Sequence, residues 1–387
     1  MEEWKTYTLA EICDLIPGFA FKSSDFGDYT DKAIKIGDIQ PPYVNYESMS
    51  GVNIQQYSPS KLAKYIVRKG DFVLAMTGAT IGKIGRYIEV NPAYLNQRVL
   101  LFKPHNNVNS KYIYYSLLSP LFQKSVLNHI DSETAQPNIS GKSVSGFEIN
   151  LPSRKEQDRI TDVLSAIDDK IELNNRINHN LEEQAQAPYK AWFVDFEPFK
   201  DGKFVDSELG MIPEGWRVGN LSELLEIRYG KDHKALKDGL IPVYGSGGFM
   251  RYAERALYEG ESVLIPRKGT LNNVMYVKGA FWTVDTMFYT VERASNAIKY
   301  CHLFLLTQDL ASMNAGSAVP SMTLDILKSL PLLIPPYQVL NDFNRVASSL
   351  YEARTQREGE SNSLSQSRDT ILPQLMSGAL TNTLLTC

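Results

Sequence analysis

Residues 4–12 read Trp-Lys-Thr-Tyr-Thr-Leu-Ala-Glu-Ile and lead to Gly18, whereas residues 216–224 read Trp-Arg-Val-Gly-Asn-Leu-Ser-Glu-Leu and lead to Gly230. The tryptophans, the first leucines, the glutamates and the closing glycines of the two stretches match at one offset of 212 residues. A period of this size is far too long for a solenoid repeat. The matches therefore predict a duplicated domain, and a protein that does a similar thing at two places.

Two further sets of matches follow along the chain. Gly70-Asp-Phe-Val-Leu matches Gly260-Glu-Ser-Val-Leu at offset 190, together with Thr80-Ile and Thr270-Leu. Pro137-Asn-Ile-Ser then matches Pro320-Ser-Met-Thr at offset 183. Because the offset falls along the chain, the second copy is shorter in its middle while its ends are kept.

Length and composition agree with a globular protein of two or three domains. The chain has 387 residues, of which 43% are hydrophobic and 22% charged, and this is typical of proteins that bury a core. No apolar run approaches the roughly 18–20 residues that cross a bilayer. The first residues, Met-Glu-Glu-Trp, do not resemble a signal peptide. The three cysteines form no CxxC pair. We therefore expect a cytoplasmic location and no membrane partner.

The charge distribution bears on nucleic-acid binding. The formal net charge is −4, and residues 1–150 hold 15 basic and 14 acidic side chains. Residues 201–336 hold 14 and 15, so both repeats are nearly neutral. A protein that binds DNA alone is usually basic. If this chain binds DNA, we expect a partner to supply much of the phosphate neutralisation.

Each repeat is followed by a segment with the 3.5-residue period of a coiled-coil seam. The first seam comprises Ile160, Leu164, Ile167, Ile171, Asn174, Asn178, Leu181 and Ala185. The second comprises Phe343, Val346, Leu350, Ala353, Arg357, Glu360, Leu364 and Ile371. The acidic and basic residues near the first seam, Asp168 among them, are expected off it. The pattern favours pairing of the two helices, and two separate amphipathic helices, each packed on its own domain, are the alternative.

Proline at 188 bears on the length of the first helix, because it removes a backbone hydrogen bond and clashes with the preceding turn. The sequence predicts a kink or an end near Ala187, and a linker over residues 197–212. Trp192, Phe193 and Phe196 are expected on a surface that suits a protein interface.

Shorter segments of each repeat have mixed periodicity. Strands are expected at residues 33–39, 71–76, 99–102, 262–265 and 274–277, and one helix over residues 109–128. Each repeat is therefore predicted to be an α/β or α+β domain.

Two motifs resemble parts of enzymes. The glycine-rich stretch 243–249 lacks a following helix pattern and an acidic residue for a ribose, so a tight turn is the favoured interpretation. Gln40-Pro-Pro-Tyr43 is similar to the Asn/Asp-Pro-Pro-Tyr/Phe motif of amino-methyltransferases, but Gln40 is the wrong residue. Paired carboxylates, a Ser/His/Asp set and a metal-ligand cluster do not stand out in the sequence. A catalytic role is therefore not indicated.

Several stretches resemble the specificity subunit of type I restriction-modification enzymes, and together they extend over essentially the whole chain. They are Lys155-Glu-Gln-Asp-Arg-Ile, Asp168-Asp-Lys-Ile-Glu-Leu-Asn-Asn-Arg-Ile-Asn, Trp192-Phe-Val-Asp-Phe-Glu-Pro-Phe, Gly210-Met-Ile-Pro-Glu-Gly-Trp and Leu372-Pro-Gln-Leu-Met-Ser-Gly. Pro188 departs from the apolar residue that this family generally has there.

The resemblance implies two target-recognition domains held apart by a long antiparallel two-helix coiled coil with pseudo-two-fold symmetry. The expected divisions are recognition domains at 1–152 and 213–335, a central spacer helix at 153–196, a linker at 197–212 and a C-terminal spacer helix at 336–381.

The resemblance also implies a non-catalytic subunit that reads a bipartite double-stranded DNA site. Its implied partners are methyltransferase subunits, two for each specificity subunit, and a restriction motor-nuclease subunit. The methyltransferase would carry S-adenosylmethionine, and this chain would bind no cofactor or metal.

Candidates for base contact are polar loop residues, because Arg and Lys suit guanine and Asn and Gln suit adenine. The first repeat offers Lys22, Ser23, Thr77, Lys83, Arg86, Asn96, Gln97 and Arg98. The second offers Lys231, His233, Lys234, Ser246, Arg267, Lys268, Asn272 and Asn273. Lys83, Arg86, Arg267 and Lys268 rank first, because glycine-rich loops approach a ligand closely. A phosphate contact or a solvated surface is the alternative role. Phe19 and Phe21 are interpreted as core residues in preference to side chains that wedge between bases.

Two other functions stay open. One is a stand-alone DNA adenine methyltransferase with its own recognition domain, which would bind S-adenosylmethionine without partners. The other is a repeat-built scaffold, which would have no DNA affinity even in a complex.

Overall fold

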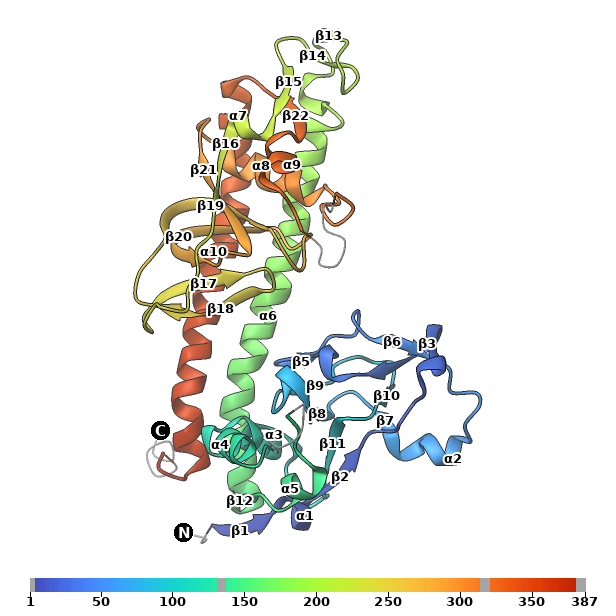
Figure 1. The fold of residues 1–387 in the computed structure, drawn as a ribbon. Helices are drawn as coiled ribbons and strands as arrows, with labels where there is room; N and C mark the ends of the chain where they lie inside the picture. Colours follow the sequence, from blue (N-terminus) through green and yellow to red (C-terminus); the bar gives the residue numbers. More distant parts are fainter. Residues whose placement is uncertain (1–3, 131–136, 314–320, 381–387) are drawn as a thin grey trace. The chain divides into compact units, whose positions relative to one another are not determined.

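The computed structural model describes residues 4–130, 137–313 and 321–380, which divide into two compact units. Unit 1 comprises residues 1–171 and 363–387, and unit 2 comprises residues 172–362. Pro320 of the third sequence match and residue 381, the end of the expected last segment, lie outside the described residues. The chain is mixed α and β, and each unit holds one large sheet (Figure 1).

The two large sheets share the order of their first four strands but not that of their outer hairpin. Unit 1 has a six-stranded sheet of β2 (Cys13–Pro17), β11 (Val99–Pro104), β8 (Phe72–Ala75), β9 (Ile84–Arg86), β5 (Tyr43–Val44) and β4 (Ile39–Gln40). Unit 2 has β16 (Leu225–Tyr229), β21 (Met287–Glu292), β19 (Tyr258–Pro266), β20 (Met275–Thr283), β17 (Ile241–Gly245) and β18 (Gly248–Ala253). In both, the first four strands are antiparallel and the fifth runs parallel to the fourth. The predicted duplication is confirmed for these four strands, whereas the outer hairpin joins the sheet through its second strand in unit 1 and through its first strand in unit 2.

The matched sequence ends form matched local structure. In unit 1, β1 (Lys5–Thr8) pairs with β12 (Glu148–Leu151) and leads into the short helix α1 (Leu9–Ile12). In the same way, β15 (Arg217–Asn220) of unit 2 pairs with β22 (Pro331–Ile334) and leads into α7 (Leu221–Leu224). The Glu11 carboxylate accepts a hydrogen bond from the Thr8 backbone N–H at 2.6 Å, and Glu223 accepts one from Asn220 at 2.9 Å. These bonds satisfy amides at each helix start, which explains why Glu11 and Glu223 match.

The helices that pack on the sheets also correspond. Unit 1 has α3 (Ser110–Leu118), α4 (Pro120–Asn128) and α5 (Gly141–Ser145); unit 2 has α8 (Ile298–Leu306) and α9 (Leu324–Lys328). The single helix expected over 109–128 is wrong, because it is divided at Ser119. The Ser119 Oγ accepts the Phe122 N–H at 3.3 Å, and Pro120 occupies the first turn of α4. Ser followed by Pro is a start signal for a new helix.

Unit 1 carries a second sheet that unit 2 does not have among its described residues. It has four strands, β6 (Ser50–Val52), β3 (Phe26–Ile34), β10 (Ala93–Leu95) and β7 (Ile66–Val67), with α2 (Pro59–Leu62) and the short 3-10 turns η1 (Ser23–Asp25) and η3 (Ala63–Tyr65). We call this part the insertion sheet. The strand expected over 33–39 is wrong, because β3 ends at Ile34 and a 3-10 turn, η2 (Ile36–Asp38), precedes β4.

The structural match between the units differs by one residue from the sequence match in one strand. Ala75 lies opposite Val99 in unit 1, and Pro266 lies opposite Met287 in unit 2, so β8 and β19 correspond at offset 191. A slip of one residue moves a side chain to the other face of a sheet. At offset 190, the buried Val73 and Val263 would be equivalent, but they belong to cores on opposite faces. After this strand the offset returns to 190, because the 3-10 turn η4 (Gly78–Thr80) has three residues where unit 2 has only Gly269 and Thr270.

The long helices α6 (Arg154–Phe193) and α10 (Tyr337–Met376) have 40 residues each. The expected end of the first helix near Ala187 is wrong, because α6 continues through Pro188. Tyr189 and Phe193 are buried in the core of unit 2, and the rings of Phe193 and Tyr300 lie 4.5 Å apart. Burying two aromatic side chains contributes about 2–3 kcal/mol each, which offsets the roughly 3 kcal/mol cost of an interior proline.

The segment after α6 is folded. It contains the turn η5 (Glu197–Phe199) and a two-stranded hairpin of β13 (Phe204–Val205) and β14 (Ile212–Pro213). The Phe199 ring lies 5.1 Å from that of Trp216. Trp192 and Phe196 pack against the same core, and Phe193 belongs to it. Phe193 is therefore buried inside its own unit, whereas an interface role of the half-buried Trp192 and Phe196 stays a prediction.

The expected seam of α6 is largely buried, including Ile160, Leu164, Asn174, Asn178 and Ala185. Asp168, expected off the seam, is buried too, because Tyr115 and Arg368 donate to its carboxylate at 2.7 and 2.8 Å. In α10, Val346 is exposed and its neighbour Ala347 is buried, so the predicted stripe is shifted there by one residue.

Residues of α6 contact residues of α10 within each unit. In unit 1, Asp168 forms an ion pair with Arg368 at 2.8 Å. The unit 2 contacts, in order along α6, are Asn174 with Glu360 at 2.8 Å, Glu182 with Arg354 at 3.4 Å, and the Phe193 ring with that of Phe343 at 4.8 Å. Across the described parts of the chain, the search for a helix both long and apolar enough to span a membrane found none.

The matched glycines lie where two backbone segments nearly touch. A Cβ added at Gly18 would lie 1.9 Å from the Asn96 carbonyl oxygen, and one at Gly230 would lie 2.0 Å from that of Val284. Only glycine fits so close to a backbone atom. The Gly18 N–H donates to Val99 O at 2.9 Å, and the Gly230 N–H to Met287 O at 2.9 Å.

We predict that Gly18→Ala destabilises unit 1 by about 1–3 kcal/mol or more, because overpacking against backbone forces it to move. Urea unfolding followed by tryptophan fluorescence and circular dichroism measures this. The control is Gly37→Ala, whose added Cβ would have no atom within 4 Å. Equal stability of the two variants would contradict the close-approach explanation.

Candidate nucleic-acid interface

Four loops meet at the end of β2 and β8 in unit 1, and they contain Gly18, Met76, Arg98 and Ile139. The equivalent loops of unit 2 contain Gly230, Arg267, Thr286 and Met322. The Met76 N–H donates to Arg98 O at 2.9 Å, and the Ile139 N–H donates to Met76 O at 2.9 Å. The same two bonds in unit 2 run from Arg267 to Thr286 O and from Met322 to Arg267 O, both at 2.8 Å. We call these two sets of loops loop cluster 1 and loop cluster 2. Their backbones are held by the same hydrogen bonds.

The side chains at matched positions of the two clusters differ. The bonds above make Met76 equivalent to Arg267 and Arg98 equivalent to Thr286. The isolated bridges, Thr77 with Asn138 and Lys268 with Ser321, make Thr77 equivalent to Lys268. Gly78 and Gly269 follow, with φ of +74° and +87°. The same backbone therefore carries different side chains in each unit: Met76 and Thr77 are buried in unit 1, whereas Lys268 is exposed in unit 2.

Loop cluster 1 brings together five of the eight candidates from the first repeat. Gln97, Arg98 and Lys83 are exposed. Arg98 has φ of +68°, a left-handed conformation that is uncommon for a residue other than glycine. Thr77 and Asn96 are buried, and the Thr77 hydroxyl donates to Pro137 O at 3.1 Å. Gln97, Arg98 and Lys83 are thus the exposed candidates of this cluster.

Arg86 lies away from these loops. It pairs with Phe72 at the start of β8, whereas the loops follow the end of β8. Its guanidinium lies 5.4 Å from the centre of the Tyr43 ring and 5.2 Å from that of Tyr114. Burial lowers the pKa of Arg86, but electrostatic interactions with Tyr114, Tyr43 and Asp168 together outweigh it and raise that pKa. These contacts stabilise the half-buried side chain inside unit 1.

Loop cluster 2 brings together Lys231, Ser246, Arg267, Lys268 and Asn273. The Lys231 N–H donates to Thr283 O at 2.9 Å, and the Asn273 side-chain amide donates to Ser246 O at 2.8 Å. The half-buried Arg267 donates to Asp285 O at 3.3 Å, and its guanidinium lies 5.3 Å from the centre of the Tyr229 ring. Lys231 and Lys268 are exposed. Asn273 is half-buried and is the counterpart of Lys83 at offset 190.

The remaining candidates of unit 2 take part in local structure. The Arg251 guanidinium donates two hydrogen bonds to His233, one to its ring Nδ1 at 3.3 Å and one to its backbone carbonyl oxygen at 2.7 Å. The Asn272 amide donates to Asp309 at 3.1 Å, which is the main reason that the pKa of Asp309 is lowered. The exposed Lys234 donates its backbone N–H to Asp232 at 3.0 Å, and this bond lowers the pKa of that carboxyl.

Lys22 and Ser23 lie on the insertion sheet and are exposed. Phe21 beside them is buried in a small core with Ala33, Val52 and Leu62, and Phe19 packs against that core. The Phe19 ring lies 4.8 Å from Phe21 in an edge-on contact. The interpretation of Phe19 and Phe21 as core residues is confirmed.

Sequence reasoning missed two exposed lysines of the insertion sheet, Lys61 and Lys64. A signal was present, because residues 48–70 contain four basic side chains and no acidic one. The falling offset also placed extra residues in the middle of the first repeat. Thr286, the counterpart of Arg98, was also missed, because only the backbone bonds reveal that equivalence.

The two enzyme-like motifs are turns. Residues 245–248 join β17 to β18, with φ of +108° at Gly248, and a strand follows in place of a helix. Gln40 and Tyr43 face each other across the β4–β5 hairpin, and Gln40 Oε1 accepts from Asn45 at 3.2 Å. Within the ranges that the structure describes, no group of three His, Cys, Asp or Glu side chains could hold a metal ion.

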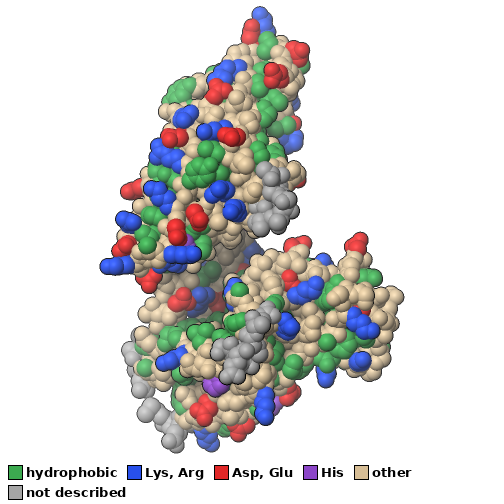
Figure 2. Space-filling view, viewed as in Figure 1, with side chains coloured by type: hydrophobic (Ala, Val, Ile, Leu, Met, Phe, Trp, Pro, Cys, Tyr) green, Lys and Arg blue, Asp and Glu red, His purple; other side chains and the backbone are tan. Residues whose placement is uncertain are grey.

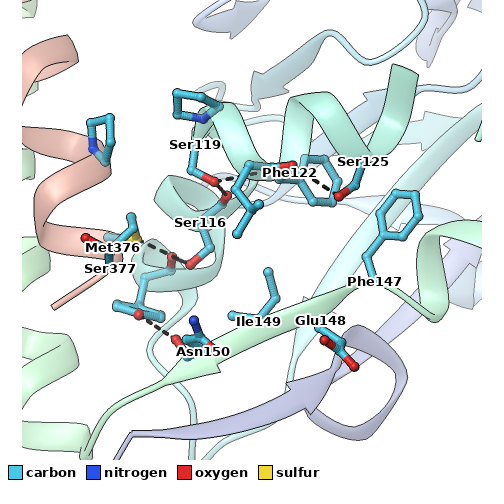
Figure 3. Close-up of a pocket in the computed structure, with 14 residues that line it drawn as sticks. Ser116, Ser119, Phe122, Ser125, Phe147, Glu148, Ile149, Asn150, Met376 and Ser377 are labelled. Atoms are coloured by element: carbon cyan, nitrogen blue, oxygen red, sulfur yellow. Dashed lines mark hydrogen bonds between the residues drawn. The ribbon is translucent and has the colours of Figure 1, made fainter. Parts of the chain in front are cut away.

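A pocket of about 160 Å³ lies in unit 1 between α3, α4, β12 and the end of α10 (Figure 3). Its serine hydroxyls are already used: Ser116 donates to Tyr112 O at 2.8 Å, and Ser119 donates to Ser116 O at 2.6 Å. With Phe122, Ile149 and Met376 on its walls, the pocket is mostly apolar and holds none of the candidate residues.

Comparison with known proteins gives a consistent result. The family model described as the type I restriction modification DNA specificity domain matches residues 1–183 and 213–340. The type I restriction enzyme MjaIX specificity subunit of Methanocaldococcus jannaschii is 26% identical, over 93% of this chain and 96% of that protein. The HindI specificity subunit of Haemophilus influenzae is 22% identical, over 98% and 100%. The crystal structure of the type I restriction-modification S subunit from M. genitalium shares the fold, with a TM-score of 0.51, 17% identity and coverage of 97% and 96%.

We predict that Lys268→Thr lowers DNA affinity by about tenfold, as expected for the loss of one base or phosphate contact. The fold should be unchanged, because unit 1 carries threonine at the equivalent position 77. Fluorescence anisotropy of the chain with its partner subunits measures affinity, and thermal unfolding checks the fold. Lys328→Thr, an exposed lysine of α9, is the control. Equal affinity of the two variants would remove Lys268 from the interface.

Proposed function

The chain belongs to the type I restriction-modification DNA specificity family, and we propose that each of its units reads one half of a bipartite double-stranded DNA site. Specificity subunits recognise DNA and are not themselves catalytic, and the relatives named above are such subunits rather than stand-alone methyltransferases. The observation that carries the proposal is the pair of loop clusters. Their backbones share hydrogen bonds, while Met76, Thr77 and Arg98 are replaced by Arg267, Lys268 and Thr286.

This pattern suits sequence recognition. A protein distinguishes bases by the donors and acceptors that it presents in the groove. A constant backbone can hold the recognising residues at fixed places, while their identity decides which bases are accepted. Two units with one scaffold and different side chains would therefore specify two different half-sites.

We further propose that α6 and α10 form an antiparallel coiled coil that acts as a spacer. The contacts within each unit support this, because the α10 partner number falls from 368 to 343 as the α6 number rises from 168 to 193. Antiparallel helices would relate the two recognition domains by a pseudo-two-fold axis, as opposed half-sites require. Two separate amphipathic helices, each packed on its own unit, are the alternative.

The proposed partners are two methyltransferase subunits and a restriction motor-nuclease subunit, in the cytoplasm. The near-neutral charge of both repeats supports partners that bind the DNA backbone as well. S-adenosylmethionine would bind to the methyltransferase and not to this chain. Isothermal titration of the isolated chain with S-adenosylmethionine tests this, and saturable binding would favour a stand-alone methyltransferase.

We predict that recognition is divided between residues 1–152 and 213–335. Exchanging either segment for that of a relative should change one half of the methylated sequence, because each unit has its own core and loop cluster. Sequencing of modified bases in cells with each chimera measures this. A simultaneous change in both halves would contradict two independent recognition domains.

We predict that the helices set the distance between the half-sites. Deleting residues 174–180 from α6 together with residues 355–361 from α10 should shorten the spacer by about 10.5 Å. The unspecified gap should then shrink by about three base pairs at 3.4 Å each, with the specified bases unchanged. Deleting the α6 segment alone is the control, because it would mismatch the pair. An unchanged gap in an assembled double deletion would contradict the spacer role.

A further inference from the structure

Three lysines of the insertion sheet, Lys22, Lys61 and Lys64, form an exposed basic group that we call the lysine rim. Lys61 is in α2 and Lys64 in η3, while Lys22 precedes η1. Figure 2 shows Lys and Arg side chains over the face that carries these elements. Such charge on a surface attracts an anionic ligand.

Other lysines of the same sheet are used inside it. The Lys35 ammonium lies 3.8 Å from the centre of the Phe26 ring and donates to Ser50 Oγ at 2.8 Å. Lys32 donates to Met49 O at 3.2 Å. Among the described residues, by contrast, no carboxylate forms an ion pair with the ammonium group of Lys22, Lys61 or Lys64. Lys61 and Lys64 lie over aromatic rings, and these contacts leave their ammonium groups exposed to a ligand.

The rim lysines are held in place by aromatic rings and one buried carboxylate. The Lys61 ammonium lies 5.4 Å from the centre of the Phe19 ring and 5.6 Å from that of Tyr57. The Tyr57 hydroxyl donates to the buried Asp25 at 2.6 Å, and this bond is the main cause of the lowered pKa of that carboxyl. Asp25 also accepts the Lys22 N–H at 2.7 Å. One anchor therefore fixes the chain beside both Lys22 and Lys61.

The rim adjoins loop cluster 1. Phe19, the ring beneath Lys61, accepts the Gln97 N–H at 2.8 Å through its carbonyl. It also forms an isolated bridge with Asn96. The Tyr65 ring, 5.3 Å from Phe19, lies 5.0 Å from the Lys64 ammonium. A duplex that meets Gln97 and Arg98 would thus have the rim beside it.

Loop cluster 2 has no counterpart of the insertion sheet in the described residues of unit 2, although Lys231, Lys234 and Lys237 are exposed near it. The segment between β5 and β8 that carries Lys61 and Lys64 corresponds to the short connection from β18 to β19. The two proposed recognition domains therefore carry the lysines beside their loops on different elements.

We propose that the lysine rim binds DNA phosphates beside the half-site read by unit 1, which gives this recognition domain a sequence-independent contact from elements without a counterpart in the described residues of unit 2. The inference rests on the proposed function and deepens it. Phosphate is the expected ligand because the rim adjoins the reading loops and offers point charges rather than paired donors. Phosphate contacts fix the position of a protein on the duplex without specifying bases.

The test is Lys61→Gln with Lys64→Gln, which removes two charges and keeps much of each side-chain stem. The full chain, assembled with methyltransferase subunits, is titrated with a labelled random-sequence duplex at several salt concentrations. The plot of log affinity against log salt should become less steep by about 1.8, or 0.9 for each lost phosphate contact. Affinity in about 0.1 M salt should fall roughly tenfold, and the methylated sequence should not change.

The matched control is Lys111→Gln with Lys124→Gln, two exposed lysines of α3 and α4 in the same unit. It has the same net charge and should keep the wild-type salt slope, as should Lys61→Arg with Lys64→Arg. A rim variant with the slope of the control would overturn the inference while leaving the proposed function in place. The inference would also be overturned if the rim variant assembled poorly with methyltransferase subunits while its assembled fraction bound DNA with unchanged affinity. That result would indicate that the rim contacts an acidic protein surface. A wild-type complex without DNA affinity would refute the proposed function itself.

Discussion

The hydrogen bonds from Gly18 to Val99 and from Gly230 to Met287 tie the first strand of each large sheet to the strand beside it. Beside these bonds, the Asn96 and Val284 carbonyl oxygens lie so close to the two glycines that a Cβ would not fit, so glycine is needed at both places. The loop clusters follow directly from this junction. Bonds through Met76 in unit 1 and Arg267 in unit 2 then hold the adjoining loops. Because backbone groups make these bonds, side chains at the tips are free to differ.

The long helices depend on polar contacts as well as on apolar ones. Asp168 is buried and satisfied by Tyr115 and Arg368, and Glu182 meets Arg354. Breaking a buried pair by removing one partner is costly, whereas the net stabilisation of an intact pair is small. Asn174 and Asn178 are buried on the same helix. A buried asparagine can fix the register of paired helices at a cost in stability, which is the property that a spacer of defined length needs.

The two units differ most where the first carries the insertion sheet. Its small core and the Asp25 anchor allow α2 to present lysines beside loop cluster 1. Unit 2 presents Arg267 and Lys268 within the loops themselves. Positive charge is therefore placed differently in the two proposed recognition domains, although each repeat is nearly neutral as a whole. Local placement of charge, rather than net charge, determines where a phosphate can bind.

The sequence by itself determined the duplication, the helical period after each repeat and the resemblance to specificity subunits. Matches such as Trp4 with Trp216 and Gly18 with Gly230 depend on residue identity, which a sequence records directly. The tertiary structure decided the register of β8 against β19, because a one-residue slip changes the face of a sheet but hardly changes a sequence match. It also decided that α6 continues through Pro188, since the compensating burial of Tyr189 and Phe193 involves residues distant in sequence. For the same reason, only the fold separated Arg86, stacked between tyrosines, from the exposed Gln97 and Arg98.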